Sequence, residues 1–301
     1  MRGSRKNQGG IYSVQTKTIR GQMWDVFGPV LLRFAVAYVV EVIVIVAYAY
    51  HYVTSLGMVT AMTQEEINAH IQVVGERLMP YSTEIGALAA LVTIPFLLRM
   101  MKRDRIREKV VVVDKGYPAV KYIYAAIMSV TFSVALNNIL LLANVAEYSE
   151  AYQESAEMLY TPSFPMQLLC LGLIYPVMEE LLFRGLIFRR IRSRMPVGYS
   201  IVASAVFFGV YHGNMVQLIY GMIAGLMLGY LCEKFGTMKA PILAHIVINI
   251  VAVILTELDA FTWMFKVPVR MVIITIVCAF VTSSMFVLIR QEKQELQEVE
   301  S

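Results

Sequence analysis

Charged residues are scarce in this sequence, and cysteine is scarcer still. Only 16% of the 301 residues are Asp, Glu, Lys or Arg, whereas 58% are apolar and the mean hydropathy is +0.62. Soluble domains average about a quarter charged residues and about half apolar ones, so a water-soluble globule is the weaker interpretation. The three cysteines, Cys170, Cys232 and Cys278, show no CxxC spacing and are expected to be buried apolar residues.

Several sequence signals are also missing. The N-terminus has no short apolar core followed by a small-residue cleavage site, so we expect the first apolar stretch to remain as a membrane anchor. There is no internal repeat, low-complexity tract or long linker. A single membrane domain over residues 1–301 is therefore the simplest organisation.

Long apolar runs are what the sequence does contain. A helix needs roughly 20 mostly apolar residues to cross the hydrocarbon of a bilayer. Eight candidate spans follow from this criterion: 28–52, 84–101, 119–145, 165–188, 197–213, 217–232, 239–256 and 267–289. The sequence predicts an all-α, polytopic integral membrane protein with about eight transmembrane helices.

The charges between these spans alternate in sign along the chain. Short cytoplasmic loops are enriched in Lys and Arg. Basic residues precede the first span and follow the second and fourth (Arg2, Arg5, Lys6, Lys17, Arg20; Lys102, Arg103, Arg105, Arg107, Lys109; Arg189, Arg190, Arg192, Arg194). The other loops are acidic (Glu65, Glu66, Glu76; Glu147, Glu150, Glu154, Glu157; Glu257, Asp259). This pattern predicts cytoplasmic termini, and it makes the net charge of +4 a topology signal rather than a sign of nucleic-acid binding.

Two of the predicted external loops have helical features. Thr63 and Glu66 have the spacing of a capping box, and apolar residues follow at helical intervals, which predicts an amphipathic helix lying on the membrane surface. The acidic segment 148–160 is expected to resemble it.

Among the polar residues inside predicted spans, we single out six in the second half of the chain. They are Glu179, Glu180 and Arg184 in the fourth, His212 in the fifth, and His245 and Asn249 in the seventh. An ionisable side chain deep in a bilayer costs at least about 2.5–3.5 kcal/mol, so such residues usually face the bundle interior and serve function. Each has a structural explanation on its own, but together they are most economically explained by convergence on one site.

Helical spacing suggests how these residues divide their roles. Glu180 and Arg184, four residues apart, can pair, which leaves Glu179 to act as a base, although spacing does not exclude the opposite assignment. His245 and Asn249 also share a helix face. At about 1.5 Å per residue, Glu179, His212 and Asn249 fall near mid-membrane. His245 falls nearer the basic side, from which we expect access.

These motifs resemble those of the CAAX protease and bacteriocin-processing (Abi) family, which includes the type II CAAX prenyl endopeptidases. The family pattern EExxxR, FxxxH and HxxxN reads here as Glu179-Glu180…Arg184, Phe208…His212 and His245…Asn249, within a core of about 165–255. The resemblance implies an intramembrane protease bundle that hydrolyses a peptide bond. It implies that Glu179 and His212 activate water, that His245 and Asn249 stabilise the oxyanion, and that Glu180, Arg184 and Phe208 support them.

Several alternatives remain open at this stage. Glu179, His212 and His245 could hold zinc, but there is no HExxH motif, and we expect a mechanism without a cofactor. A transporter or channel would also carry intramembrane acids and histidines, although no inverted repeat is visible. A non-catalytic immunity or scaffold protein would use the same pocket to bind a peptide. The expected partner is a leader peptide, bacteriocin or signalling peptide at a bacterial plasma membrane.

Overall fold

The computed structural model describes residues 19–56, 63–107, 115–144 and 149–291, and every regular element within them is helical. The elements before residue 150 are α1 (Ile19–Ser55), α2 (Gln64–Leu78), the 3₁₀ turn η1 (Met79–Tyr81), α3 (Ser82–Arg107) and α4 (Ala119–Leu142). Those after it are α5 (Glu150–Tyr160), α6 (Phe164–Leu169), the π-helix η3 (Cys170–Ile174), α7 (Tyr175–Glu180), the π-helix η4 (Leu181–Phe188), α8 (Arg189–Arg192), α9 (Val197–Tyr211), α10 (Met215–Phe235), α11 (Lys239–Glu257), α12 (Ala260–Phe265) and α13 (Pro268–Gln291).

The prediction of an all-α polytopic membrane protein is confirmed. Seven helical stretches among the described residues are long and apolar enough to cross a bilayer. The predicted span 197–213 corresponds to α9, which has 15 residues and is the shorter, eighth apolar helix. Several charged residues of the loops lie outside the described part of the chain, namely Arg2, Arg5, Lys6, Lys17, Lys109 and Glu147. So do residue 145, the end of the third predicted span, and residue 148, the start of the acidic segment.

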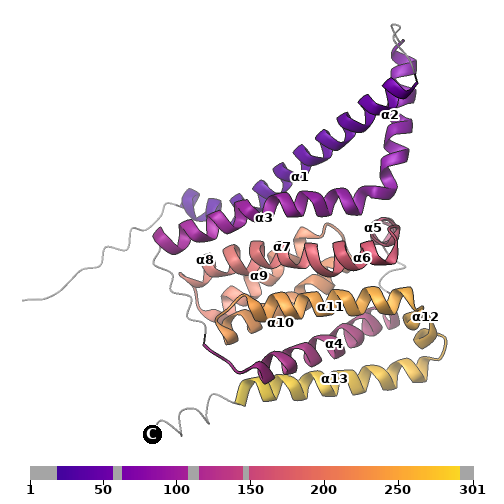
Figure 1. The fold of residues 1–301 in the computed structure, drawn as a ribbon. Helices are drawn as coiled ribbons and strands as arrows, with labels where there is room; N and C mark the ends of the chain where they lie inside the picture. Colours follow the sequence, from indigo (N-terminus) through magenta and orange to yellow (C-terminus); the bar gives the residue numbers. More distant parts are fainter. Residues whose placement is uncertain (1–18, 57–62, 108–114, 145–148, 292–301) are drawn as a thin grey trace, which may run out of the picture.

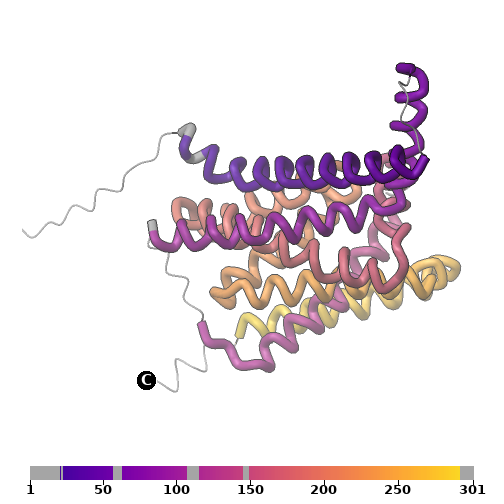
Figure 2. Tube along the Cα trace, turned by 45° about the horizontal axis from the view of Figure 1, so that its top comes forward, coloured from indigo at the N-terminus to yellow at the C-terminus, as the bar shows by residue number. Residues whose placement is uncertain are grey.

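The long helices lie side by side in layers (Figure 1). Helices α1 and α3 form one outer layer, α4 and α13 pair at the opposite edge, and the α6–α8 run, α9, α10 and α11 lie between them. Figure 2 shows α2 projecting from one end of this bundle. The short helices α5 and α12 lie at that same end, whereas α8 lies at the other (Figure 1). The described chain begins and ends at the α8 end.

The fourth predicted span is interrupted by two π-helical segments. η3 precedes α7 and η4 follows it, so the short α-helical segment that carries Glu179 and Glu180 lies between two stretches of altered hydrogen bonding. π-helical segments appear often at functional sites. All eight residues of η4 are buried, which places this run at the centre of the bundle.

Helices α9 and α10 form a tight hairpin through glycine contacts. A Cβ atom added at Gly225 would lie 2.9 Å from Ala205, and one added at Gly209 would lie 2.6 Å from the carbonyl of Leu218. Small residues at such positions allow two helices to approach closely. The connection turns through Gly213, whose φ of 78° suits glycine, and the Asn214 side chain caps α10.

The short length of α9 leaves space inside the bundle. Fifteen helical residues span about 22 Å, whereas the hydrocarbon is about 30 Å thick. The α9–α10 turn therefore ends inside the depth reached by the longer helices. Helix α5 covers this gap, since it packs on both α3 and α10.

The two predicted loop helices are present as α2 and α5. Thr63 accepts a hydrogen bond from the Glu66 backbone, and the Glu66 carboxylate accepts one from the Thr63 backbone at 2.8 Å, which completes the predicted capping box. Cys170 and Cys232 are buried, as expected, whereas Cys278 is only half-buried, and all three are free thiols.

Candidate functional site

One cavity of about 610 Å³ brings together the intramembrane residues picked out by the sequence. Glu179, Phe208, His212, His245 and Asn249 all line it, from α7, α9 and α11 and the turn after α9. Three helices far apart in sequence therefore present their polar side chains to one space. Their chemical roles remain a prediction.

Glu180 and Arg184 lie behind the cavity wall as an ion pair. Arg184 donates from Nη1 to Glu180 Oε1 at 2.6 Å, and both side chains are fully buried, so the predicted pairing is present. Arg184 also donates to the Gly225 carbonyl at 3.1 Å and stacks on the Phe208 ring, with 4.6 Å from its guanidinium carbon to the ring centre. The arginine thus ties η4 to both helices of the hairpin.

His245 lies between the two glutamates. Its Nδ1 is 2.9 Å from Glu180 Oε1, and its Nε2 is 3.7 Å from Glu179 Oε2. Because an ionised carboxylate only accepts, Nδ1 carries the hydrogen. This hydrogen bond to Glu180 orients the His245 ring. The other ring nitrogen, Nε2, faces Glu179.

The four members of this cluster, Glu179, Glu180, Arg184 and His245, are all buried, and a buried net charge is costly. Arg184 pairs with Glu180, which leaves Glu179 facing Nε2 of His245.

His212 has its tautomer fixed by a backbone group. Its Nδ1 is 2.8 Å from the carbonyl of Phe208, which can only accept, so this nitrogen carries the hydrogen in the neutral ring. Nε2 then keeps its lone pair on the other edge of the ring. Since His212 lines the cavity, the ring can accept a hydrogen bond from a water molecule there.

Asn249 is oriented by the first π-helix. Its amide donates to the Leu171 carbonyl in η3 at 2.9 Å. One amide N–H is thereby used, and a second N–H remains for a group in the cavity. His245 and Asn249 share one face of α11, as their spacing predicted.

Tyrosines form a second set of polar cavity residues that sequence reasoning missed. Five line the cavity, namely Tyr152, Tyr160, Tyr175, Tyr211 and Tyr220. Two of them, Tyr152 and Tyr160, belong to α5 outside the spans, and burial raises the pKa of both phenols, which keeps them as neutral donors. With 17 tyrosines in the chain, no sequence signal marked these five.

Arg33 of α1 is a buried cation that was also missed. It is 6% exposed, and its Nη2 donates a hydrogen bond to the Gly86 carbonyl at 3.5 Å. Arg33 interacts electrostatically with Tyr175 and Tyr211, and both tyrosines also interact with Glu179. The first span, which carries no family motif, therefore contributes a positive charge beside the cavity.

The cavity extends away from the basic end of the bundle. From Glu179 and His245 it runs along α11 to Thr256 and reaches α5 and α12, which lie opposite α8. The cavity therefore extends toward the end opposite to the basic side, from which access was expected. The short α9 explains the difference, because its early turn leaves the space on the α5 side.

Within the described residues, no group of three or more His, Cys, Asp and Glu side chains lies close enough to hold a metal ion together. Glu179, His212 and His245 therefore do not fit zinc as a ligand set in this arrangement.

Comparison with known proteins supports the grouping that the motifs suggested. Residues 161–251 match the family described as "Type II CAAX prenyl endopeptidase Rce1-like", and this stretch contains every residue of the three motifs. Over this stretch the chain is similar to the CAAX protease family. The Rce1-like stretch runs from the start of α6 almost to the end of α11, and so covers the cavity walls formed by α7, α9 and α11.

A curated relative extends this comparison. "Putative membrane peptidase YdiL" of Bacillus subtilis (strain 168) is 25% identical over 91 residues, which are 30% of this chain and 37% of YdiL. The match thus spans little more than a third of that relative. No solved structure is significantly similar to the chain.

Proposed function

We propose that the protein is an intramembrane endopeptidase in which Glu179 activates the attacking water. The observation that carries this proposal is the single cavity onto which Glu179, His212, His245 and Asn249 converge. The names of the family and of YdiL support peptide-bond hydrolysis as the reaction class. A carboxylate, two imidazoles and an amide supply the groups that uncatalysed amide hydrolysis lacks.

The proposed reaction proceeds through a tetrahedral intermediate. A water molecule lies between Glu179 and His212. It gives one proton to the Glu179 carboxylate and donates a hydrogen bond to His212 Nε2. The water oxygen attacks the carbonyl carbon of the substrate. The oxyanion accepts hydrogen bonds from the second Asn249 N–H and from His245, whose ring is doubly protonated in this step, with Nδ1–H on Glu180 and Nε2–H on the oxyanion. Glu179 then passes its proton to the amide nitrogen, the C–N bond breaks, and a carboxylic acid and an amine leave.

The supporting residues hold this geometry. Glu180 and Arg184 fix His245, and Phe208 supports both His212 and Arg184 through ring contacts, with the Phe208 and His212 ring centres 4.9 Å apart. Buried hydrogen-bonded partners of this kind limit the movement of catalytic side chains. The proposal therefore assigns positioning roles to Glu180, Arg184 and Phe208.

The substrate side of the proposal is a peptide that reaches the cavity at the membrane. We propose a leader, bacteriocin or signalling peptide as the substrate class and a bacterial plasma membrane as the location. The charges of the loops favour cytoplasmic termini. With that orientation the cavity extends toward the external side. The apolar residues along α11 and α12 suit an extended peptide with apolar side chains.

Separate measurements of binding and hydrolysis test the proposal. Purified protein in detergent is given a panel of fluorogenic peptides, and binding is followed by anisotropy of uncleaved peptides. The wild type is expected to bind and cleave, and Glu179→Ala to bind without cleaving. Binding without cleavage by the wild type would support an immunity or scaffold protein instead.

Chelation tests the metal-independent mechanism. Among the described residues, no three His, Cys, Asp or Glu side chains lie close enough to hold a metal ion. The rate of hydrolysis is therefore expected to fall less than about two-fold after dialysis against a strong chelator. Metal content is measured by mass spectrometry on the same samples. Stoichiometric zinc that leaves together with activity would overturn the glutamate mechanism in favour of a metalloprotease.

A further inference from the structure

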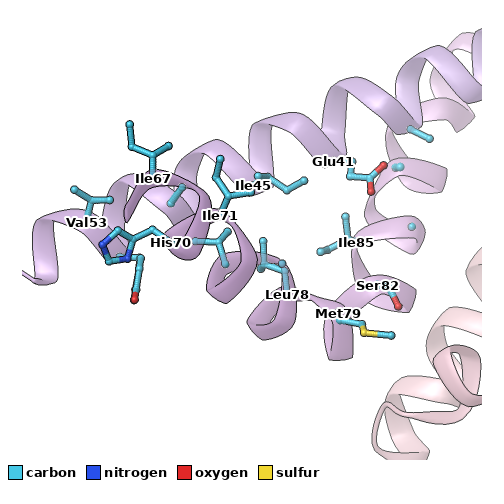
Figure 3. Close-up of a pocket in the computed structure, with 17 residues that line it drawn as sticks. Glu41, Ile45, Val53, Ile67, His70, Ile71, Leu78, Met79, Ser82 and Ile85 are labelled. Carbon is cyan, nitrogen blue, oxygen red and sulfur yellow. The ribbon is translucent and has the colours of Figure 1, made fainter. Parts of the chain in front are cut away.

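A second cavity, of about 640 Å³, lies between α1 on one side and α2 and α3 on the other. We name it the α1 groove. Figure 3 shows its walls, which are mainly apolar and include Ile45, Val53, Ile67, Ile71, Leu78 and Ile85. It shares no lining residue with the cavity that contains Glu179.

The groove exists because α1 leaves the bundle. Its N-terminal part packs on α3, η4 and α8, and its far end meets α2, so that α1 and α3 diverge (Figure 1). In the most apolar stretch of α1, only 11% of the residues are buried within the protein. Residues of α1 from Ala37 to Val53 line the groove, a length of about 24 Å along the helix.

Glu41 places a carboxylate in this apolar groove. It lies close to the middle of the candidate span Met23–Ser55, and it shares a helix face with Ala37 and Ile45. In Figure 3 its side chain lies on the face of α1 that lines the groove. Glu41 is exposed, and in the described part of the chain no hydrogen bond or ion pair holds it.

A carboxylate at this depth calls for a positive partner. Its insertion into a bilayer costs at least about 2.5–3.5 kcal/mol, and intramembrane charges usually pair with one another. His70 lines the same groove but stacks on Tyr52, with ring centres 5.6 Å apart. Glu41 does not line the cavity that contains Glu179, and the proposed hydrolytic mechanism gives Glu41 no role.

We propose that the α1 groove docks one transmembrane helix of a partner protein that carries a lysine or arginine at mid-depth, paired with Glu41. The apolar walls match the side chains of such a helix, and the 24 Å run covers most of the hydrocarbon thickness of about 30 Å. A second copy of the chain is a poor occupant. Among its described residues, Arg33, Lys121 and Arg184 are buried in their own bundle, whereas Arg99 lies beside the basic end of α3 and Arg270 in the first turn of α13.

Photo-crosslinking in lipid nanodiscs tests this docking. A photoreactive amino acid replaces Ile85 in the groove or, as the matched control, Phe280 on the exposed face of α13. The probes are apolar peptides of roughly 20 residues with either Lys or Leu at the centre. We expect the Lys peptide to crosslink at position 85 at least about ten-fold more than the Leu peptide, with no such preference at position 280.

Charge reversal makes the test specific. Glu41→Gln is expected to lower crosslinking of the Lys peptide to the level of the Leu peptide, and Glu41→Lys to restore crosslinking with a peptide that carries a central Glu. Equal crosslinking of the Lys and Leu peptides, as a lipid-filled groove would give, would overturn the proposal. So would a Lys preference that survives Glu41→Gln. The assay needs no hydrolysis and can use Glu179→Gln protein, so its outcome is independent of the proposed peptidase activity.

Discussion

Replacement of Glu179 by glutamine is expected to lower peptide hydrolysis by about a hundred-fold to ten-thousand-fold, the range that a positioned general base contributes. Glutamine keeps the shape of the side chain but cannot take the proton of the attacking water. Glu179 faces His245 Nε2 at 3.7 Å and is 8% exposed, so this replacement alters the cavity chemistry with little change of packing. The measurement is the initial rate on a peptide that the wild type cleaves.

The matched control for Glu179 is Glu154→Gln. Glu154 is an exposed carboxylate on α5 that does not line the cavity, and its replacement is expected to leave the rate unchanged. Thermal unfolding of both variants shows whether the fold is kept. Full activity in folded Glu179→Gln protein would remove Glu179 as the base and leave the opposite assignment, with Glu180, to be examined.

Replacement of Arg184 by methionine is expected to destabilise the bundle by about 3–5 kcal/mol. The change removes the partner of the fully buried Glu180 carboxylate and also the donor to the Gly225 carbonyl. An unpaired carboxylate in this position must either remain charged in an apolar surrounding or take up a proton. The expected result is a large fall in unfolding temperature in detergent, together with loss of hydrolysis, because His245 loses a fixed partner.

A double replacement separates the charge effect from packing. Glu180→Gln combined with Arg184→Met removes both charges at once, and it is expected to recover much of the stability that the single change loses. Activity is not expected to return, since His245 has then lost the carboxylate that orients it. If the double variant is no more stable than Arg184→Met, the destabilisation arises from lost packing against Phe208 rather than from the unpaired charge.

Polar residues inside apolar spans can be recognised from the sequence alone. Glu179, His212, His245 and Asn249 were identifiable because each is polar within an apolar run, and charge in lipid needs a reason. Arg33 and Glu41 satisfy the same criterion in the first span, but reasoning that followed the family motifs passed over them. Tyrosine gives no such signal, because its ring is at home in both apolar and polar surroundings.

Contacts between helices could not be predicted from spacing. The i,i+4 pairing of Glu180 with Arg184 was predictable, because both residues lie on one helix face. The bond from His245 to Glu180 was not, since it depends on how α11 packs against α7. The direction in which the cavity extends could not be predicted either, because depth counted along single helices does not show where a short helix leaves space.

By itself, the sequence determined that this chain is a helical membrane protein, which residues break the apolar pattern, and which family they match. Hydropathy and the 3.6-residue period are local properties, so they can be read from one segment at a time. Only the tertiary structure decided that these residues share one cavity, that His245 bridges two glutamates, and that Glu41 lies in a separate groove. These are contacts between segments far apart in the chain, and packing of whole helix surfaces sets them.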